Sequence, residues 1–191
     1  MIRLYLFLLM GIIAVSTASI FIKLCDAPAL IIAAYRVVFA SLILSPFAYS
    51  QRIWKGWNRS EISWLVLSGV FLSLHFAFWI GSLKYTSVAS SVVLVSTHPI
   101  FVGIGSWVIL KERLGVKLII AIGLSVLGSG VISFGDMSLS KEALVGDGLA
   151  LLGALTVTGY FLIGRKMRRK KGLLSYVFPV YSTAGLALIF L

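Results

Sequence analysis

Seven long apolar runs divide this sequence, and they constrain its fold more than any other feature. A helix that rises 1.5 Å per residue needs about 20 residues to cross the ~30 Å hydrocarbon core of a bilayer. The runs are Leu4–Ile22, Ala29–Tyr49, Ile62–Leu83, Ser87–Leu110, Val116–Phe134, Leu144–Gly164 and Leu173–Leu191. Of the 191 residues, 60% are apolar and only 12% are charged, which is too apolar for one water-soluble core. The sequence therefore predicts an all-α integral membrane protein, a helix bundle with seven spans.

Composition also excludes several classes of function. The net charge of +11 could suggest nucleic-acid binding, but long apolar runs separate the basic residues, so we expect no nucleic-acid partner. Cys25 is the single cysteine and there are two histidines, too few for a disulfide framework or a confident zinc site. No run carries an Asp or Glu at its centre, so acid–base chemistry lacks its groups. We expect no enzymatic activity, metal or cofactor.

The basic residues are distributed unequally between alternate loops. Thirteen of the 17 lysines and arginines flank the N-terminus and every second loop, whereas three lie on the opposite side. The thirteen are Arg3, Arg52, Lys55, Arg59, Lys111, Arg113, Lys117, Arg165, Lys166, Arg168, Arg169, Lys170 and Lys171. Because loops rich in Lys and Arg stay in the cytoplasm, we expect a cytoplasmic N-terminus. The run Arg165–Lys171 is expected to fix this topology and to contact anionic lipid.

Two spans resemble each other at an offset of 142 residues. Gly11 aligns with Gly153, and Val15 aligns with Val157. An odd number of spans, five, separates the starts of the two copies, so the second copy enters the membrane from the opposite side, as in secondary transporters with inverted repeats. A complete second copy would need three more helices after Leu191. We therefore expect a fragment of a ten-span protein, with a degenerate half as the alternative.

Several short sequences carry a family resemblance. They are Ala34–Arg36, Ala77–Ser87, His98–Phe101, Leu110–Leu114 and Gly146–Leu149, together with Gly123, Gly128 and Val131. With these residues the chain resembles the EamA family of the drug/metabolite transporter superfamily along nearly its whole length. The resemblance implies a ten-helix protein made of two five-helix repeats. It also implies a multi-pass protein of the plasma membrane, or of the inner membrane in a bacterium, that exports or exchanges small metabolites.

The resemblance also suggests how the chain is divided. Residues 1–134 would form the first five-helix repeat, residues 135–143 an external loop, and residues 144–191 the first two helices of an incomplete second repeat. The leading hypothesis is a secondary transporter that works by alternating access. The alternative is a non-transporting membrane subunit or sensor built on the same bundle. A seven-span chain would leave small-residue faces without partners, so we expect it to be unstable or to self-associate in detergent.

Arg36 is the candidate around which a binding site is predicted. It is the basic residue that lies well inside a span, where a charge is costly and usually functional. A guanidinium in a low-dielectric site favours a carboxylate or phosphate, so an anionic or amino-acid-like substrate is expected. Tyr35 is the neighbouring candidate. The alternative is that Arg36 anchors the bundle by bonding to carbonyls or to a loop acid such as Asp26.

The third span carries a polar and aromatic stripe. Ser68, Leu72, His75, Trp79 and Ser82 recur at helical spacing and so share one face of the helix. We expect His75 and Trp79 to face one cavity together with the predicted arginine, with Ser68 as a further substrate-binding candidate. The alternative is that the stripe packs against another helix and that His75 is hydrogen-bonded to a neighbour.

Proline and small residues indicate architecture in other spans. Pro99 has no amide hydrogen and leaves a carbonyl free one turn earlier, so we expect a structural kink in the fourth span. Small residues recur at every fourth position in the fifth and sixth spans, which predicts close packing of helices. They are Ala121, Ser125, Ser129 and Ser133 in the fifth span, and Gly146, Ala150, Ala154 and Thr158 in the sixth.

The predicted orientation is testable with single cysteines placed in residues 51–60, 111–117 and 165–172. In intact cells these cysteines should resist a membrane-impermeant thiol reagent, because the loops face the cytoplasm, and they should react once the membrane is permeabilised. Cysteines in residues 135–143 serve as the accessible control. Labelling of the three basic loops in sealed cells would refute both the orientation and the inverted arrangement of the repeats.

Overall fold

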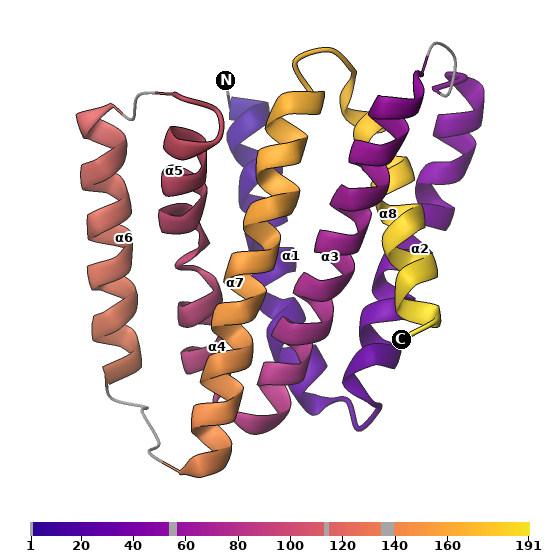
Figure 1. Ribbon diagram of the computed structural model, residues 1–191. Helices are drawn as coiled ribbons and strands as arrows, with labels where there is room; N and C mark the ends of the chain where they lie inside the picture. Colours follow the sequence, from indigo (N-terminus) through magenta and orange to yellow (C-terminus); the bar gives the residue numbers. More distant parts are fainter. Residues whose placement is uncertain (1, 54–56, 113–114, 135–139) are drawn as a thin grey trace.

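A computed structural model describes residues 2–53, 57–112, 115–134 and 140–191, and within these residues the chain is helical without strands (Figure 1). The helices are α1 (Ile2–Leu24), α2 (Ala29–Ser50), α3 (Arg59–Tyr85), α4 (Val88–Val95), α5 (His98–Val108), α6 (Val116–Phe134), α7 (Lys141–Met167) and α8 (Leu173–Ile189). The prediction of an all-α membrane bundle is confirmed.

The apolar runs and the helices coincide closely. Among the described residues, five stretches are long and apolar enough to cross a membrane: Leu4–Leu24, Ala29–Ser50, Arg59–Tyr85, Val88–Val108 and Lys141–Met167. Two further apolar stretches, Val116–Gly128 and Leu173–Ile189, are shorter. Most of α1 and α6 is exposed, and large apolar side chains cover that surface. In water such a surface would be unstable, whereas in a bilayer it faces lipid.

The fourth apolar run is the one that divides into two helices. α4 ends at Val95 and α5 begins at His98, so Ser96 and Thr97 interrupt the helix. Pro99 lies in the first turn of α5, where a residue without an amide hydrogen costs nothing because that turn has no intrahelical acceptor. The Thr97 hydroxyl donates a 2.6 Å hydrogen bond to the Leu94 carbonyl. The span that was expected to kink at Pro99 is therefore broken just before it.

α3 and α7 pack against each other along the centre of the bundle, and α8 packs on both α2 and α3 (Figure 1). Small residues bring α7 close to α3 and α4. At Gly146 a Cβ atom would lie 2.8 Å from the Thr86 backbone nitrogen, and at Gly159 2.7 Å from the Phe71 ring. Ala154 is fully buried. The predicted packing face of the sixth span is confirmed.

The small residues of the fifth span were also predicted to form a packing face, and the one that the structure describes does not. Ala121 is exposed on α6, so it does not contribute to a packed face. The side chains of Ser125, Ser129 and Ser133 lie outside the described residues. Within the described part, α6 packs mainly against α4.

Ion pairs join the helices at one end of the bundle, called here the basic end. It holds the start of α1 and the ends of α2, α5 and α7 (Figure 1). Glu112 Oε2 lies 2.8 Å from an Arg165 nitrogen, although the angles are not those of a hydrogen bond, and the other oxygen accepts one from Arg169. Lys171 lies 3.3 Å from Glu61. The alternate basic segments thus gather on one side.

A separate hydrogen-bond network joins the helices at the opposite end. The Lys23 ammonium donates to the carbonyls of Leu83 at 2.5 Å and Thr86 at 2.9 Å. One Asp147 oxygen accepts hydrogen bonds from the hydroxyls of Thr86 and Ser90, both at 2.8 Å. α1, the α3–α4 turn and α7 are therefore linked directly where the helices leave the apolar layer.

We predict that Gly69→Ala destabilises the bundle, whereas Gly81→Ala on the same helix does not. A Cβ atom at Gly69 would meet Thr183 at 2.6 Å and the Val180 carbonyl oxygen at 2.9 Å, but at Gly81 its nearest neighbour would be 3.9 Å away. Overpacking of this kind costs about 1–3 kcal/mol. Thermal unfolding of the two purified variants in the same detergent measures the difference. Equal melting temperatures would show that α8 does not pack on α3 at this point.

Candidate functional site

Arg36 of α2 lies across two aromatic rings of α3. Its guanidinium carbon is 5.3 Å from the ring centroid of Phe76 and 5.3 Å from that of Trp79, distances at which a cation is attracted to the face of an aromatic ring. Its Nη1 atom is buried and has no hydrogen-bond partner. In the described part of the chain Arg36 forms no ion pair, neither with Asp26 nor with another acid.

His75 adds a third ring to this cluster and links it to α7. Its imidazole stacks on Trp79 with centroids 5.9 Å apart and planes 11° apart. Its Nδ1 atom lies 2.9 Å from the Gly153 carbonyl oxygen. Because a carbonyl only accepts, Nδ1 carries the hydrogen and Nε2 of the neutral ring is left as an acceptor. The alternative in which His75 bonds to a neighbouring helix is therefore the observed arrangement.

Trp79 occupies the centre of the cluster. It is 7% exposed, and its indole Nε1 is buried without a hydrogen-bond partner. Arg36 Nη1 and Trp79 Nε1 are thus two buried donors, on groups that contact each other, that lack acceptors. Unpaired buried donors are uncommon and each costs roughly 1–3 kcal/mol. The structure therefore brings Arg36, His75 and Trp79 together and leaves Arg36 and Trp79 each with a buried donor that has no acceptor.

The other two candidates lie apart from the cluster. Tyr35 is 58% exposed and stacks on Phe39 with centroids 5.6 Å apart. Ser68 is fully buried, and its oxygen is 2.5 Å from the Tyr176 hydroxyl oxygen. Because the Tyr176 hydroxyl donates to the Tyr160 carbonyl at 2.8 Å, Ser68 is the donor to Tyr176. The Ser68 hydroxyl is already engaged in a link between α3, α7 and α8.

Two residues of the cluster were not among the sequence candidates. Phe76 lies beside the predicted stripe on α3, yet the Arg36 guanidinium contacts its ring as well as that of Trp79. It does so because neighbouring helices cover a broader face of α3 than the stripe alone. Tyr181 of α8 is partly buried and packs against the core that contains Trp79. When four extra residues are allowed in the loop that follows the first repeated span, the alignment of the two repeats also pairs Tyr35 with Tyr181, and this pairing is a sequence signal that could have found it.

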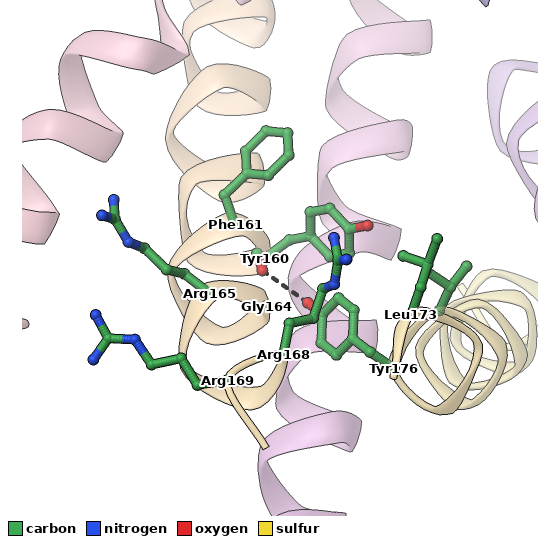
Figure 2. Close-up of a pocket in the computed structure, with 9 residues that line it drawn as sticks. Tyr160, Phe161, Gly164, Arg165, Arg168, Arg169, Leu173 and Tyr176 are labelled. Carbon is green, nitrogen blue, oxygen red and sulfur yellow. Dashed lines mark hydrogen bonds between the residues drawn. The ribbon is translucent and has the colours of Figure 1, made fainter. Parts of the chain in front are cut away.

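Three cavities accompany this cluster, and each is lined by other residues. One of about 660 Å³ lies between α2 and α8 and includes Tyr35 in an otherwise mainly aliphatic wall. One of about 280 Å³ lies nearby on the same two helices and includes Tyr181. The third, of about 410 Å³, lies at the basic end between α7 and α8 (Figure 2). Arg36, His75 and Trp79 thus form a packed cluster rather than the wall of any of these three cavities.

The cluster of Arg36, His75 and Trp79 has groups suited to binding an anion. A guanidinium and an indole N–H can both donate to one oxyanion, and the three rings offer an apolar surface. Among the described residues no group of three or more His, Cys, Asp or Glu side chains could hold a metal ion. The arrangement fits recognition of a small anion in an apolar setting.

Comparison with known proteins identifies the class. The sequence pattern of the EamA-like transporter family matches residues 2–134, so the chain belongs to that family, which is one of transporters and not of enzymes. A protein named an uncharacterized transporter, from Archaeoglobus fulgidus, is 29% identical over 144 residues, covering 73% of this chain and 48% of that protein. The chain spans about half the length of this relative. No solved structure matches.

We predict that Ser68 stabilises the bundle through Tyr176. In a double-mutant cycle, Ser68→Ala and Tyr176→Phe should each destabilise the protein. Their effects should be coupled by about 0.5–1.5 kcal/mol, because each variant removes one end of the same buried hydrogen bond. Unfolding of the single and double variants in detergent gives the coupling. Strictly additive effects would mean that the 2.5 Å contact contributes nothing.

Proposed function

We propose that the protein is a secondary transporter that exports or exchanges a small metabolite by alternating access. Membership of a transporter family and the similarity to a protein named as a transporter support this proposal. The similarity of the first and sixth spans supports an inverted repeat, for which residues 144–191 would be the opening of the second copy. We also propose that the basic end faces the cytoplasm, because loops rich in Lys and Arg are retained there.

The substrate site that we propose is the cluster of Arg36, His75 and Trp79. The observation that carries it is the buried Arg36 Nη1 atom, which has neither an acid nor a hydrogen-bond acceptor in the described part of the chain. An anionic substrate group that accepts from Arg36 Nη1 and Trp79 Nε1 would satisfy both donors at once. The low dielectric between the helices strengthens such a charge-assisted bond.

The aromatic rings suggest the rest of the substrate. His75 and Trp79 are stacked within 11° of parallel, so they present an extended flat surface beside the guanidinium. Such a surface holds an apolar group by contact or a cationic group by its ring electrons. A molecule that joins a carboxylate to an apolar or cationic part, as an amino acid does, fits both features.

A second function is supported by one specific observation. The cation–π contacts of Arg36 with Phe76 and Trp79 already offset part of the cost of burying its charge. An arginine held in this way could hold α2 against α3 in a membrane subunit or sensor that transports nothing. Arg36→Lys keeps the positive charge but removes the planar guanidinium, so its effect on transport separates the two functions.

Substitution of Arg36 in the full-length protein tests the site. In proteoliposomes, with uptake of a mixture of labelled L-amino acids as the readout, Arg36→Ala should lower transport by roughly 10–150-fold, the equivalent of a lost charged hydrogen bond of about 1.5–3 kcal/mol. Arg36→Lys should give a smaller loss, because it keeps the charge and loses the fork of donors. Trp79→Phe keeps an aromatic ring but removes the N–H donor and part of the buried indole, so it should weaken transport, and its melting temperature shows how much of the loss comes from packing.

Arg59→Ala is the matched control, since it removes one exposed positive charge from the first turn of α3. It should transport at the wild-type rate. Protein levels and melting temperatures are measured for every variant. Wild-type transport by Arg36→Ala, or a loss that only follows the amount of folded protein, would assign Arg36 to the anchoring role.

A further inference from the structure

The cavity at the basic end combines positive charge with an apolar wall (Figure 2). Its volume is about 410 Å³. It is lined by Tyr160, Phe161, Gly164, Arg165, Arg168, Arg169, Leu173, Tyr176 and Val177. These residues belong to the last turns of α7, the turn that follows it and the first turns of α8, so the cavity lies at the basic end where the chain passes from one helix to the other.

The three arginines of this cavity differ in their partners. Arg165 and Arg169 both pair with Glu112, so two guanidinium groups share one carboxylate. The backbone N–H of Arg168 donates to the Gly164 carbonyl, but its guanidinium forms no hydrogen bond or ion pair with another residue in the described part of the chain. Figure 2 shows Arg165 and Arg169 extending from one side of α7, whereas Arg168 lies on the side of Tyr160 and Leu173. Arg168 is therefore the unneutralised cation of the cavity.

The tyrosines of the cavity also differ in their partners. The Tyr176 hydroxyl is engaged with Ser68 and with the Tyr160 carbonyl. The Tyr160 hydroxyl forms no hydrogen bond to another described group, and Figure 2 shows Tyr160 and Arg168 on the same side of α7, where both line the cavity. Arg168 and the Tyr160 hydroxyl together offer donors for the oxygens of one phosphate group.

The wall beside these donors is apolar. Leu173 is 56% exposed at the start of α8, and Val177, one turn further along the helix, is half-buried. A free inorganic anion would gain nothing from this wall. An amphiphile whose charged head reaches Arg168 and whose hydrocarbon chain follows Leu173 and Val177 would use both parts of the cavity.

We propose that this cavity binds an anionic phospholipid from the membrane leaflet at the basic end. Its phosphate accepts hydrogen bonds from Arg168 and from the Tyr160 hydroxyl, and its acyl chain lies along Leu173 and Val177. The bound lipid bridges the end of α7 and the start of α8. This proposal is independent of the substrate site, because it concerns binding to the folded protein and requires no transport.

The test measures stabilisation of the full-length protein in a neutral detergent on addition of dioleoyl phosphatidylglycerol. Dioleoyl phosphatidylcholine and inorganic phosphate are the comparison probes. We expect phosphatidylglycerol to raise the melting temperature by about 2–4 °C more than phosphatidylcholine, because a ligand that binds only the folded state stabilises it. Millimolar inorganic phosphate should leave the melting temperature unchanged. An equal shift with inorganic phosphate would overturn the lipid in favour of a free anion.

Arg168→Gln should raise the phosphatidylglycerol concentration for half-maximal stabilisation about fivefold, the equivalent of one basic contact near a membrane surface. Tyr160→Phe should also raise it. Lys170→Gln is the matched control, since it removes the same charge two residues away and does not line the cavity, and it should stay within about twofold of wild type. Equal losses in Arg168→Gln and Lys170→Gln, or no preference for phosphatidylglycerol over phosphatidylcholine, would overturn the proposal.

Discussion

The close contact of α3 with α7 is the constraint on which the rest of the structure depends. Between helices in a bilayer there is no hydrophobic driving force, so association depends on tight packing and on hydrogen bonds. Small residues on α7 meet the requirement: at Gly153 a Cβ atom would lie only 3.4 Å from the Trp79 backbone nitrogen. The same approach brings the Gly153 carbonyl to His75. The close packing of α3 against α7 therefore also positions His75 in the candidate site.

The second constraint on the structure is that the buried charge of Arg36 must be stabilised. In the described part of the chain the charge of Arg36 is offset by aromatic faces and not by a carboxylate. A guanidinium is more weakly hydrated than an ammonium and stacks on rings, so it is suited to this setting. An ion pair would have satisfied the donors permanently. Aromatic faces leave Nη1 unpaired, and this free donor is what the proposed substrate site requires.

The two ends of the bundle are held together by different chemistry. At the basic end, Glu61 and Glu112 pair with the excess of cations on the last turns of α7 and the loop beyond it. At the opposite end, Lys23 and Asp147 bond to backbone carbonyls and hydroxyls. Both sets of contacts join distant parts of the chain near the ends of the membrane-spanning helices. There such polar links are formed at a lower desolvation cost than inside the bilayer.

The spans, their boundaries to within three residues and the alternation of charge could all be predicted from the sequence. They depend on local properties, namely hydropathy over about 20 residues and the charge of each loop. The face of α3 that carries His75 and Trp79 also followed from helical spacing. The family followed from a pattern spread along the chain.

The sequence did not determine which groups meet. Ser68 and Trp79 share a face of α3, yet Ser68 bonds to Tyr176 of α8 while Trp79 stacks on His75 and meets Arg36. Tyr35 and Arg36 are adjacent in sequence, but successive residues of a helix point about 100° apart, so one is exposed and the other reaches the cluster. Within Arg165–Lys171, the sequence does not distinguish Arg165 and Arg169, which pair with Glu112, from Arg168. That difference depends on how α7 packs against its neighbours. The sequence alone determined what each segment is, because that depends on local hydropathy and charge; only the tertiary structure decided which side chains are satisfied, because that depends on contacts between distant helices.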